Sequence, residues 1–362
     1  MSGKTLKGRF LSVDILRGMT VCFMIIVNNG AGKSFPFLRH AQWNGMTPCD
    51  MVFPFFLFIM GVSVALASPK SIGKILRRTV SIILVCWGIF WFGCLLGGDW
   101  LPFDHFRLTG VLVRIALSYC AVALLARKLK PGPLAGIAAA LLCLYSVLLL
   151  AGNGYVNDET SIIAKVDIAL LGQNHLYRQM PVDPEGLLGL IPSVAHAILG
   201  YLCGRILKSD STPGGRVLRM ASFGAVLLVA GLIVRIWLPL NKTIWSPSFV
   251  LVTCGSAAIL LALLSLLLDG NLTARPVRSG DMPERDRAGF FKVFGVNPLA
   301  LYVLSEVLAT ISWHFSIPRK ASELFRGFLP PEWASLLYAL LFMLICWSVG
   351  LLLYRKKVYI KL

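Results

Sequence analysis

The chain has 362 residues, of which 57% are hydrophobic and only 14% are charged, whereas an ordinary soluble domain carries about 25% charged residues. This composition excludes an ordinary soluble domain and indicates an integral membrane protein. The formal net charge of +18 does not by itself point to nucleic acid, because basic residues also gather in the loops on one side of a membrane. We expect a lipid bilayer as partner and no nucleic acid.

Segments that are long and apolar enough to cross a bilayer as helices, which takes about 20 residues, recur along the whole chain. In chain order, the ten expected spans are residues 12–28, 49–68, 79–97, 108–126, 132–151, 187–206, 219–239, 247–268, 291–313 and 333–354. When the connections are assigned alternately to two sides, most Lys and Arg residues fall on the side of the N-terminus. Since basic loops face the cytoplasm, both termini are predicted to be cytoplasmic. The predicted fold is an all-α, polytopic bundle of about ten transmembrane helices, with residues 1–362 as a single domain.

The connection between the first two spans is predicted to be extracytoplasmic and contains His40, Trp43 and Asn44. An imidazole takes up and releases protons near neutral pH, so His40 is a candidate general base. The alternative is a solvated loop histidine without a catalytic task. Trp43 is either an anchor at the membrane interface, where tryptophan is enriched, or a platform for a sugar ring. We expect Trp43 and Asn44 to contact a substrate.

Asn28 lies at the outer end of the first span, where its amide N–H can donate to the oxyanion of an attacked acyl group. Asp50 follows Thr47 in the sequence TPCD, which is typical of a capping box at a helix start. Its expected role is therefore to begin the second span rather than to catalyse. Within that span, the small residues Gly61 and Ala65 predict close contact with another helix.

Several charged residues fall inside spans, where exposure to lipid is unfavourable by about 2.5 to 3.5 kcal/mol on insertion scales. Asp14 and Arg17 are three residues apart and can face each other on one helix, either as a structural ion pair or as part of a binding site. Arg114 is a candidate for contacting a phosphate or a buried acid. Glu306 has no partner nearby in sequence, and one of these arginines is a candidate. Asn297 before Pro298 predicts a helix start.

The second large outer loop, between the fifth and sixth spans, contains His175, Asp183 and Glu185. These groups suit hydrogen bonding to a polyhydroxylated substrate. The competing interpretation is ordinary turn chemistry, because the sequence DPEG before a helix is also typical of a turn and an N-terminus.

Familiar soluble-enzyme motifs are absent from the sequence. It has no Walker loop, GxSxG elbow or HExxH motif, and its five histidines lack metal-ligand spacing, so no metal site is expected. The nine cysteines form no CxxC pair and mostly resemble small buried hydrophobes. Cys49 and Cys94, both near the outer side, are a candidate disulfide.

Motifs along nearly the whole chain resemble the catalytic membrane domain of the heparan-α-glucosaminide N-acetyltransferase family and its bacterial relatives. The motifs, in order, are SVDILRG, IIVNNGAGK, HAQWNGMTPCDMVFPFFLFIMGVS, RLTGVLVRIALSY, LLGQNHLY followed by DPEGLLGLIPS, NKTIWSPSFVLVTCG and FGVNPLALYVLSEV. The resemblance implies a polytopic acyltransferase that takes acetyl from cytoplasmic acetyl-CoA and delivers it to a glucosamine amine across the membrane. The family's essential histidine falls on His40 and its asparagine on Asn28, and Asp14 and Arg17 also match.

We therefore expect a transmembrane N-acetyltransferase in a bacterial inner membrane, with acetyl-CoA as co-substrate and an amino sugar as acceptor. In the preferred mechanism, His40 removes a proton from the attacking amine and Asn28 stabilises the oxyanion; an acetyl-His40 intermediate is the alternative. Asp14, Arg17 and Arg114 are the expected acetyl-CoA contacts, and a homodimer is an expected assembly. The leading alternative function is a transporter of amino sugars or N-acetylglucosamine. It would be favoured by internal repeats with interrupted helices, which the sequence does not display.

Overall fold

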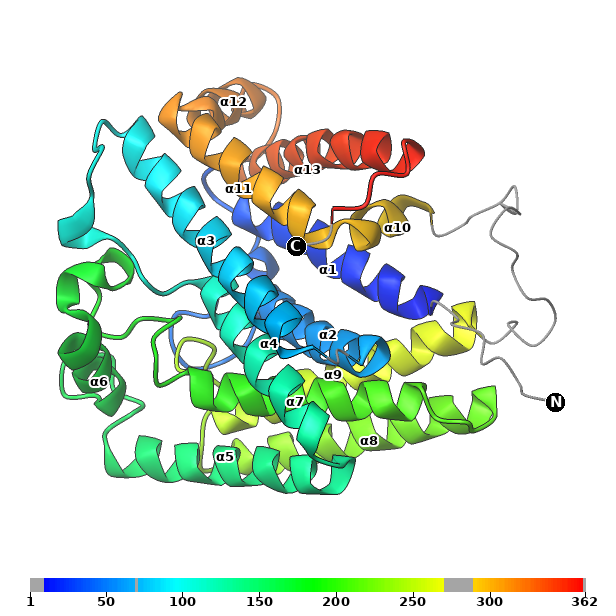
Figure 1. Ribbon diagram of the computed structural model, residues 1–362. Helices are drawn as coiled ribbons and strands as arrows, with labels where there is room; N and C mark the ends of the chain where they lie inside the picture. Colours follow the sequence, from blue (N-terminus) through cyan, green and yellow to red (C-terminus); the bar gives the residue numbers. More distant parts are fainter. Residues whose placement is uncertain (1–9, 69–70, 270–288, 361–362) are drawn as a thin grey trace.

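A computed structural model describes residues 10–68, 71–269 and 289–360, and every regular element in these ranges is helical (Figure 1). The basic residues Lys4, Lys7 and Arg9 and most of the polar linker before the ninth span lie outside the described residues. The helices are α1 (Leu11–Asn28), α2 (Val52–Ala67), α3 (Ile72–Leu96), α4 (Val111–Lys128), α5 (Pro131–Ala151), α6 (Ile162–Leu171), α7 (Leu190–Leu207), α8 (Pro213–Val234), α9 (Pro247–Leu268), α10 (Gly289–Val296), α11 (Pro298–His314), α12 (Ile317–Arg326) and α13 (Pro331–Arg355). The polytopic all-α prediction is confirmed.

Each expected span corresponds to a helix or a helix pair. Within the described ranges, eight helices are long and apolar enough to cross a membrane, and the α10–α11 pair would make nine. The remaining segment, α4, carries Arg114, Arg127 and Lys128 and is therefore less apolar than the others. Two short helices, α6 and α12, lie in connections that were expected to be loops.

The ninth span is not the continuous helix expected over residues 291–313. It is divided into α10 and α11, whose axes differ by 85°. The break lies at Asn297, and Pro298 is the first residue of α11. Because proline lacks a backbone N–H and its ring excludes the preceding turn, the chain starts a new helix there. The Asn297 side chain donates to Val358 O at 2.8 Å and accepts from Ile360 N at 2.9 Å, which ties the bend to the chain after α13.

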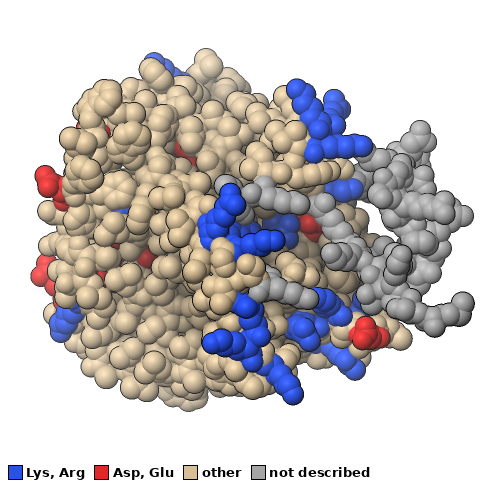
Figure 2. Space-filling model, in the orientation of Figure 1, with Lys and Arg blue, Asp and Glu red and all other residues tan. Residues whose placement is uncertain are grey.

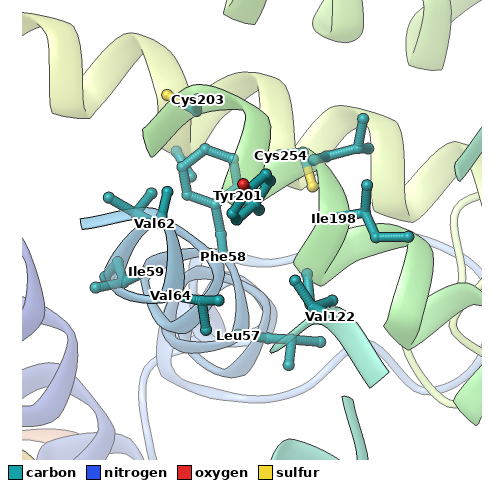
Figure 3. Close-up of a cluster of buried hydrophobic side chains, with 14 of the residues drawn as sticks. Leu57, Phe58, Ile59, Val62, Val64, Val122, Ile198, Tyr201, Cys203 and Cys254 are labelled. Atoms are coloured by element: carbon teal, nitrogen blue, oxygen red, sulfur yellow. The ribbon is translucent and has the colours of Figure 1, made fainter. Parts of the chain in front are cut away.

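The centre of the bundle is the contact between α2 and α7. A Cβ atom on Gly61 would lie 2.2 Å from the carbonyl oxygen of Ala197, and one on Gly200 would lie 2.2 Å from that of Phe58. Glycine at both positions lets the two backbones approach to a distance that a side chain would prevent, as is common between membrane helices. Figure 3 shows the buried side chains around this contact, with Phe58 of α2 beside Tyr201 of α7. The predicted close packing at Gly61 is confirmed.

The spanning helices alternate in direction between two ends of the bundle (Figure 1). One end holds the starts of α1, α3, α5 and α8 and the end of α13; we call it the basic end. Figure 2 shows that Lys and Arg side chains gather there, whereas Asp and Glu are seen mainly toward the opposite end. The opposite end holds α6, α12 and the loop that contains His40, and we call it the loop end. The assignment of the basic end to the cytoplasm stays a prediction from the positive-inside rule.

Candidate active site

A cavity of about 490 Å³ opens at the loop end, between the end of α1 and the start of α4. Its walls come from the α1–α2 loop, the α3–α4 and α8–α9 connections, residues before α7, and α11. Polar lining residues include Asn28, His40, Arg107, Glu185, Lys242 and Glu306. Phe53, Phe90, Trp43 and Trp245 supply apolar surface. A cavity of this size with few converging polar groups has the character of a small-molecule site.

His40 is held by the start of the second span. Asp50 is the third residue after the Thr47 N-cap, and both reciprocal contacts of a capping box are present. Its Oδ2 accepts hydrogen bonds from Thr47 N at 3.0 Å and from Ala41 N at 3.1 Å. Its Oδ1 lies 2.7 Å from Nδ1 of His40. The predicted capping box is confirmed, and the same carboxylate also fixes the imidazole.

The exposure of the two partners differs sharply: the His40 side chain is 52% exposed, whereas that of Asp50 is 1% exposed. A buried carboxylate beside Nδ1 favours the tautomer with its proton on Nδ1, which leaves the Nε2 lone pair to accept a proton. His40 therefore has the geometry of an oriented base at a solvent-accessible cavity. Cys49, which is not in a disulfide, lies with Sγ 3.2 Å from Nδ1.

The α8–α9 connection, about 200 residues after the His40 loop, also lies beside His40. Asn241 Nδ2 donates to Asn44 Oδ1 at 3.2 Å, and Gly45 N donates to Leu240 O at 2.7 Å. These bonds join two loops and bring Lys242 to the cavity, with Nζ 3.0 Å from Nδ1 of His40. Asn44, expected to bind substrate, is not part of the cavity lining and instead joins these loops.

Asn28 lines the cavity at the end of α1. Its side chain is hydrogen-bonded to the Glu306 carboxylate, which also contacts the phenol of Tyr302. The amide carries two N–H groups, so one remains for another acceptor when the other donates to Glu306. The partners of Glu306 are thus Asn28 and Tyr302 rather than an arginine.

Arg107 forms the opposite wall together with the second outer loop. Its Nη2 lies 2.9 Å from Asp183 Oδ1 and 2.5 Å from Glu185 Oε2. Asp183 also accepts from Thr109 Oγ1 at 3.0 Å and from Tyr177 N at 2.9 Å. Burial alone would lower the pKa of Arg107, but the two carboxylates outweigh it and raise that pKa. Asp183 is fully engaged in this network, whereas Glu185 lines the cavity.

Trp43 and His175, both expected to contact substrate, are each held by a hydrogen bond to a backbone carbonyl. Trp43 lines the cavity while its indole N–H donates to Tyr155 O at 2.8 Å. His175 lies outside the cavity lining, with Nδ1 2.7 Å from Phe106 O. Trp43 thus keeps a ring available to a ligand, and His175 joins the second outer loop to the α3–α4 connection.

Of the three residues expected to contact acetyl-CoA, Asp14 and Arg17 lie together, whereas Arg114 has other partners. Arg17 lies toward the basic end, where it donates to Ser63 Oγ at 2.9 Å and to Gly295 O at 3.1 Å. It also lies 3.3 Å from Asp14, so the predicted i, i+3 pair is present. Arg114 is 1% exposed, donates to Gly186 O at 3.3 Å and lies 5.2 Å from the ring centroid of Trp245.

Sequence reasoning missed Lys242 as part of the site, as well as the second role of Asp50. A local signal existed for Asp50, because a histidine ten residues before a capping acid can return to it across a short loop. Lys242 is 202 residues from His40, and neither composition nor local spacing joins the two.

Sequence comparisons identify relatives of this chain. A family model described as heparan-alpha-glucosaminide N-acetyltransferase, catalytic, matches residues 9–240. Heparan-alpha-glucosaminide N-acetyltransferase of Mus musculus is 30% identical in an alignment of 371 positions. The alignment covers 83% of this chain and 54% of the mouse protein. The Homo sapiens protein of the same name is 28% identical in an alignment of 425 positions. The alignment covers 98% of this chain and 60% of the human protein. The chain thus spans somewhat more than half the length of these relatives.

Proposed function

The chain belongs to the heparan-α-glucosaminide N-acetyltransferase family, and from this premise we propose that it is a membrane-embedded N-acetyltransferase. It moves an acetyl group from cytoplasmic acetyl-CoA to the amine of an amino sugar on the far side of a bacterial inner membrane. Acetyl-CoA, the amino sugar and the bilayer are its partners in this proposal, and a homodimer stays a prediction.

One observation carries the proposal: the exposed imidazole of His40 lines a cavity while the buried Asp50 carboxylate lies 2.7 Å from its Nδ1. A base held in one tautomer at a cavity is what proton removal from a bound amine requires.

In the direct mechanism, the amine nitrogen of the acceptor attacks the thioester carbonyl carbon. The new C–N bond forms, the C–S bond breaks, and CoA leaves as a thiolate. His40 takes the amine proton on Nε2 and can pass it to the thiolate, while Asn28 donates to the oxyanion. The competing route, in which Nε2 itself takes the acetyl group and passes it to the amine, uses the same two residues.

The acceptor is proposed to bind between Trp43 and Glu185. A tryptophan face stacks on the apolar face of a sugar, and the Glu185 carboxylate accepts hydrogen bonds from hydroxyl or ammonium groups. Asn44, His175 and Asp183 support this site from behind by joining the loops that form it.

Acetyl-CoA is proposed to enter from the basic end, where Lys and Arg side chains can attract its phosphates. Arg17, beside Asp14, would be a phosphate contact near this entrance, and Arg114 would act only from within the core. Beside the cavity lies a separate apolar pocket of about 10 Å³, which shares Phe53 and Tyr302 with it and is also lined by Met24, Phe56 and Ile115. A pantetheine arm that crosses here must displace these side chains, so acetyl transfer requires a conformational change.

One observation favours the transporter alternative. The α10–α11 pair is a broken helix with an 85° bend, and discontinuous helices commonly form substrate sites in secondary transporters. The bend is next to Gly295, whose backbone carbonyl binds Arg17. A transporter would move an amino sugar without modifying it.

The test uses purified protein in proteoliposomes with labelled acetyl-CoA and a panel of amino sugars. Wild type should form an acetylated sugar, and His40→Ala should reduce its rate by about 10²-fold or more, the contribution expected of a general base. His105→Ala is the matched control, because His105 is exposed at the same end, pairs with Asp99 and does not line the cavity. Unchanged transfer by His40→Ala would remove this residue from the mechanism. Sugar uptake without acetylation would establish the transporter, and a trapped acetyl-His40 would exclude direct transfer.

A further inference from the structure

Lys242 occupies an unusual position relative to the imidazole of His40. Its Nζ lies 3.0 Å from Nδ1 and 3.3 Å from Nε2. A nitrogen nearly equidistant from both ring nitrogens cannot lie in the ring plane, because it would collide with the carbon between them. The Lys242 amine therefore lies over a face of the ring, while Asp50 Oδ1 faces Nδ1 at 2.7 Å and lies 3.6 Å from Nζ.

The loop that carries Lys242 is built to hold this position. Asn241 N donates to Ser246 Oγ at 3.0 Å, and Asn241 Oδ1 accepts from Ile244 N at 3.1 Å. Trp245 N donates to Lys242 O at 3.1 Å, although Trp245 has a φ of 54°. A positive φ is unfavourable for a bulky side chain, so the surrounding contacts must enforce this turn.

We infer that Lys242 is a positioning residue that keeps the His40 imidazole neutral, with Asp50 holding the one ring proton at Nδ1 and the Lys242 ammonium opposing a second. This inference rests on the proposed function, in which His40 is the base. Asp50 alone would favour a doubly protonated ring, which cannot accept a proton from an amine. A cation over the ring face offsets that effect, so Nε2 stays free.

Of the groups close to the His40 ring, Asp50 and Lys242 are the two that we expect to decide its protonation. Cys49 Sγ lies 3.2 Å from Nδ1, and Cys49 is buried. Burial lowers the pKa of Lys242, while the charge of Asp50 offsets part of that effect. The remaining charged side chains that line the cavity are Arg107, Glu185 and Glu306.

If Lys242 were deprotonated, its amine could act as a second base instead of opposing protonation of the ring. Substitution of Lys242 by arginine distinguishes these two roles. A guanidinium is always charged and cannot accept a proton in this pH range. Lys242→Arg therefore keeps a positioning charge but abolishes a basic amine, whereas Lys242→Met removes both.

The experiment follows acylation of His40 by diethyl pyrocarbonate, which reacts with neutral imidazole, by peptide mass spectrometry from pH 5 to 9 without substrate. In Lys242→Met, the midpoint should move up by roughly one pH unit, the effect of a unit charge at this distance in a water-like dielectric. Lys242→Arg should keep the wild-type midpoint, as should Lys320→Met, which removes an exposed lysine of α12. Lys242→Gln is the second neutral variant and should match Lys242→Met, and melting in detergent confirms that each variant is folded.

An unchanged or lower midpoint in both neutral variants would overturn the inference, and so would a Lys242→Arg midpoint that matches Lys242→Met. The acid limb of the kcat/KM profile should move by the same amount as the acylation midpoint. Because the acylation assay needs no turnover, failure of the two proposals can be told apart. A shifted midpoint in a protein that transfers no acetyl would refute the proposed function alone, whereas active enzyme without a shift would refute this inference alone.

Discussion

The two oxygens of Asp50 have separate partners, and Asp50→Asn is predicted to affect them unequally. Oδ2 accepts from Ala41 N, Thr47 N and Thr47 Oγ1, all at 3.0 to 3.1 Å. Oδ1 accepts from His40 Nδ1 at 2.7 Å. An asparagine has only one acceptor oxygen, so its NH₂ group must replace one of the two.

Placing the amide oxygen at the Oδ2 site preserves the helix cap and turns the NH₂ group toward His40. The reverse orientation would leave two backbone N–H groups facing a donor, each unfavourable by about 1 to 3 kcal/mol. The first orientation should therefore prevail, and His40 must then carry its proton on Nε2, where it cannot act as a base. We expect kcat/KM to fall by about 10²- to 10⁴-fold, the upper figure being the loss from the equivalent change in a serine-protease triad.

The assay compares acetyl transfer and melting temperature in detergent for three variants. Asp50→Asn should melt close to wild type, whereas Asp50→Ala should lose several kcal/mol because the backbone donors of Ala41 and Thr47 then have no acceptor. Asp99→Asn is the control, since Asp99 pairs with His105 at 3.2 Å at the same end outside the cavity. Activity of Asp50→Asn within threefold of wild type, or a melting loss equal to that of Asp50→Ala, would refute the reasoning.

Three further predictions concern stability. Gly61→Val should destabilise the bundle by about 1 to 3 kcal/mol or more, because its Cβ would lie 2.2 Å from a backbone carbonyl oxygen of α7. Gly88→Val, with no atom within 4 Å of the added carbon, should melt like wild type, and equal melting of the two variants would contradict the packing argument. Burial raises the pKa of Asp167 to about 6, above its unfolded value near 3.9, so the folded state binds the extra proton and stability should fall by about 2 to 3 kcal/mol as pH rises from about 4 to about 6. Asp167→Asn should remove this decrease in chemical denaturation, and a decrease of the same size in the variant would count against the reasoning. Arg107→Leu should lower the free energy of unfolding by about 3 kcal/mol or more, since it leaves the Asp183 and Glu185 carboxylates without their cation. Limited proteolysis should then cut the loop before α7, and an uncut loop would argue that the ion pairs do not hold it.

The sequence by itself determined the features that depend on neighbouring residues. Apolar length predicted the spanning helices, because a helix in lipid satisfies its backbone hydrogen bonds within its own segment. The capping box is likewise local, because its hydrogen bonds join Thr47 and Asp50, which are three residues apart. Asn297 before Pro298 predicts a helix start, but the residues on both sides of it are apolar, so hydropathy alone predicts one continuous span. Only the packing of the rest of the chain shows that the axis turns by 85° there.

Only the tertiary structure decided which polar groups share the cavity. His40 and Asp50 are ten residues apart, whereas Lys242 arrives from a loop 202 residues away. Arg107 meets its carboxylates across more than 70 residues. The residues around a charged side chain in the sequence do not show which group it will pair with. Its partner depends on how distant loops are held together, for example by the hydrogen bond from Gly45 N to Leu240 O. The sequence could therefore propose His40 as a candidate base, but which charged groups surround its ring is a property of the folded chain.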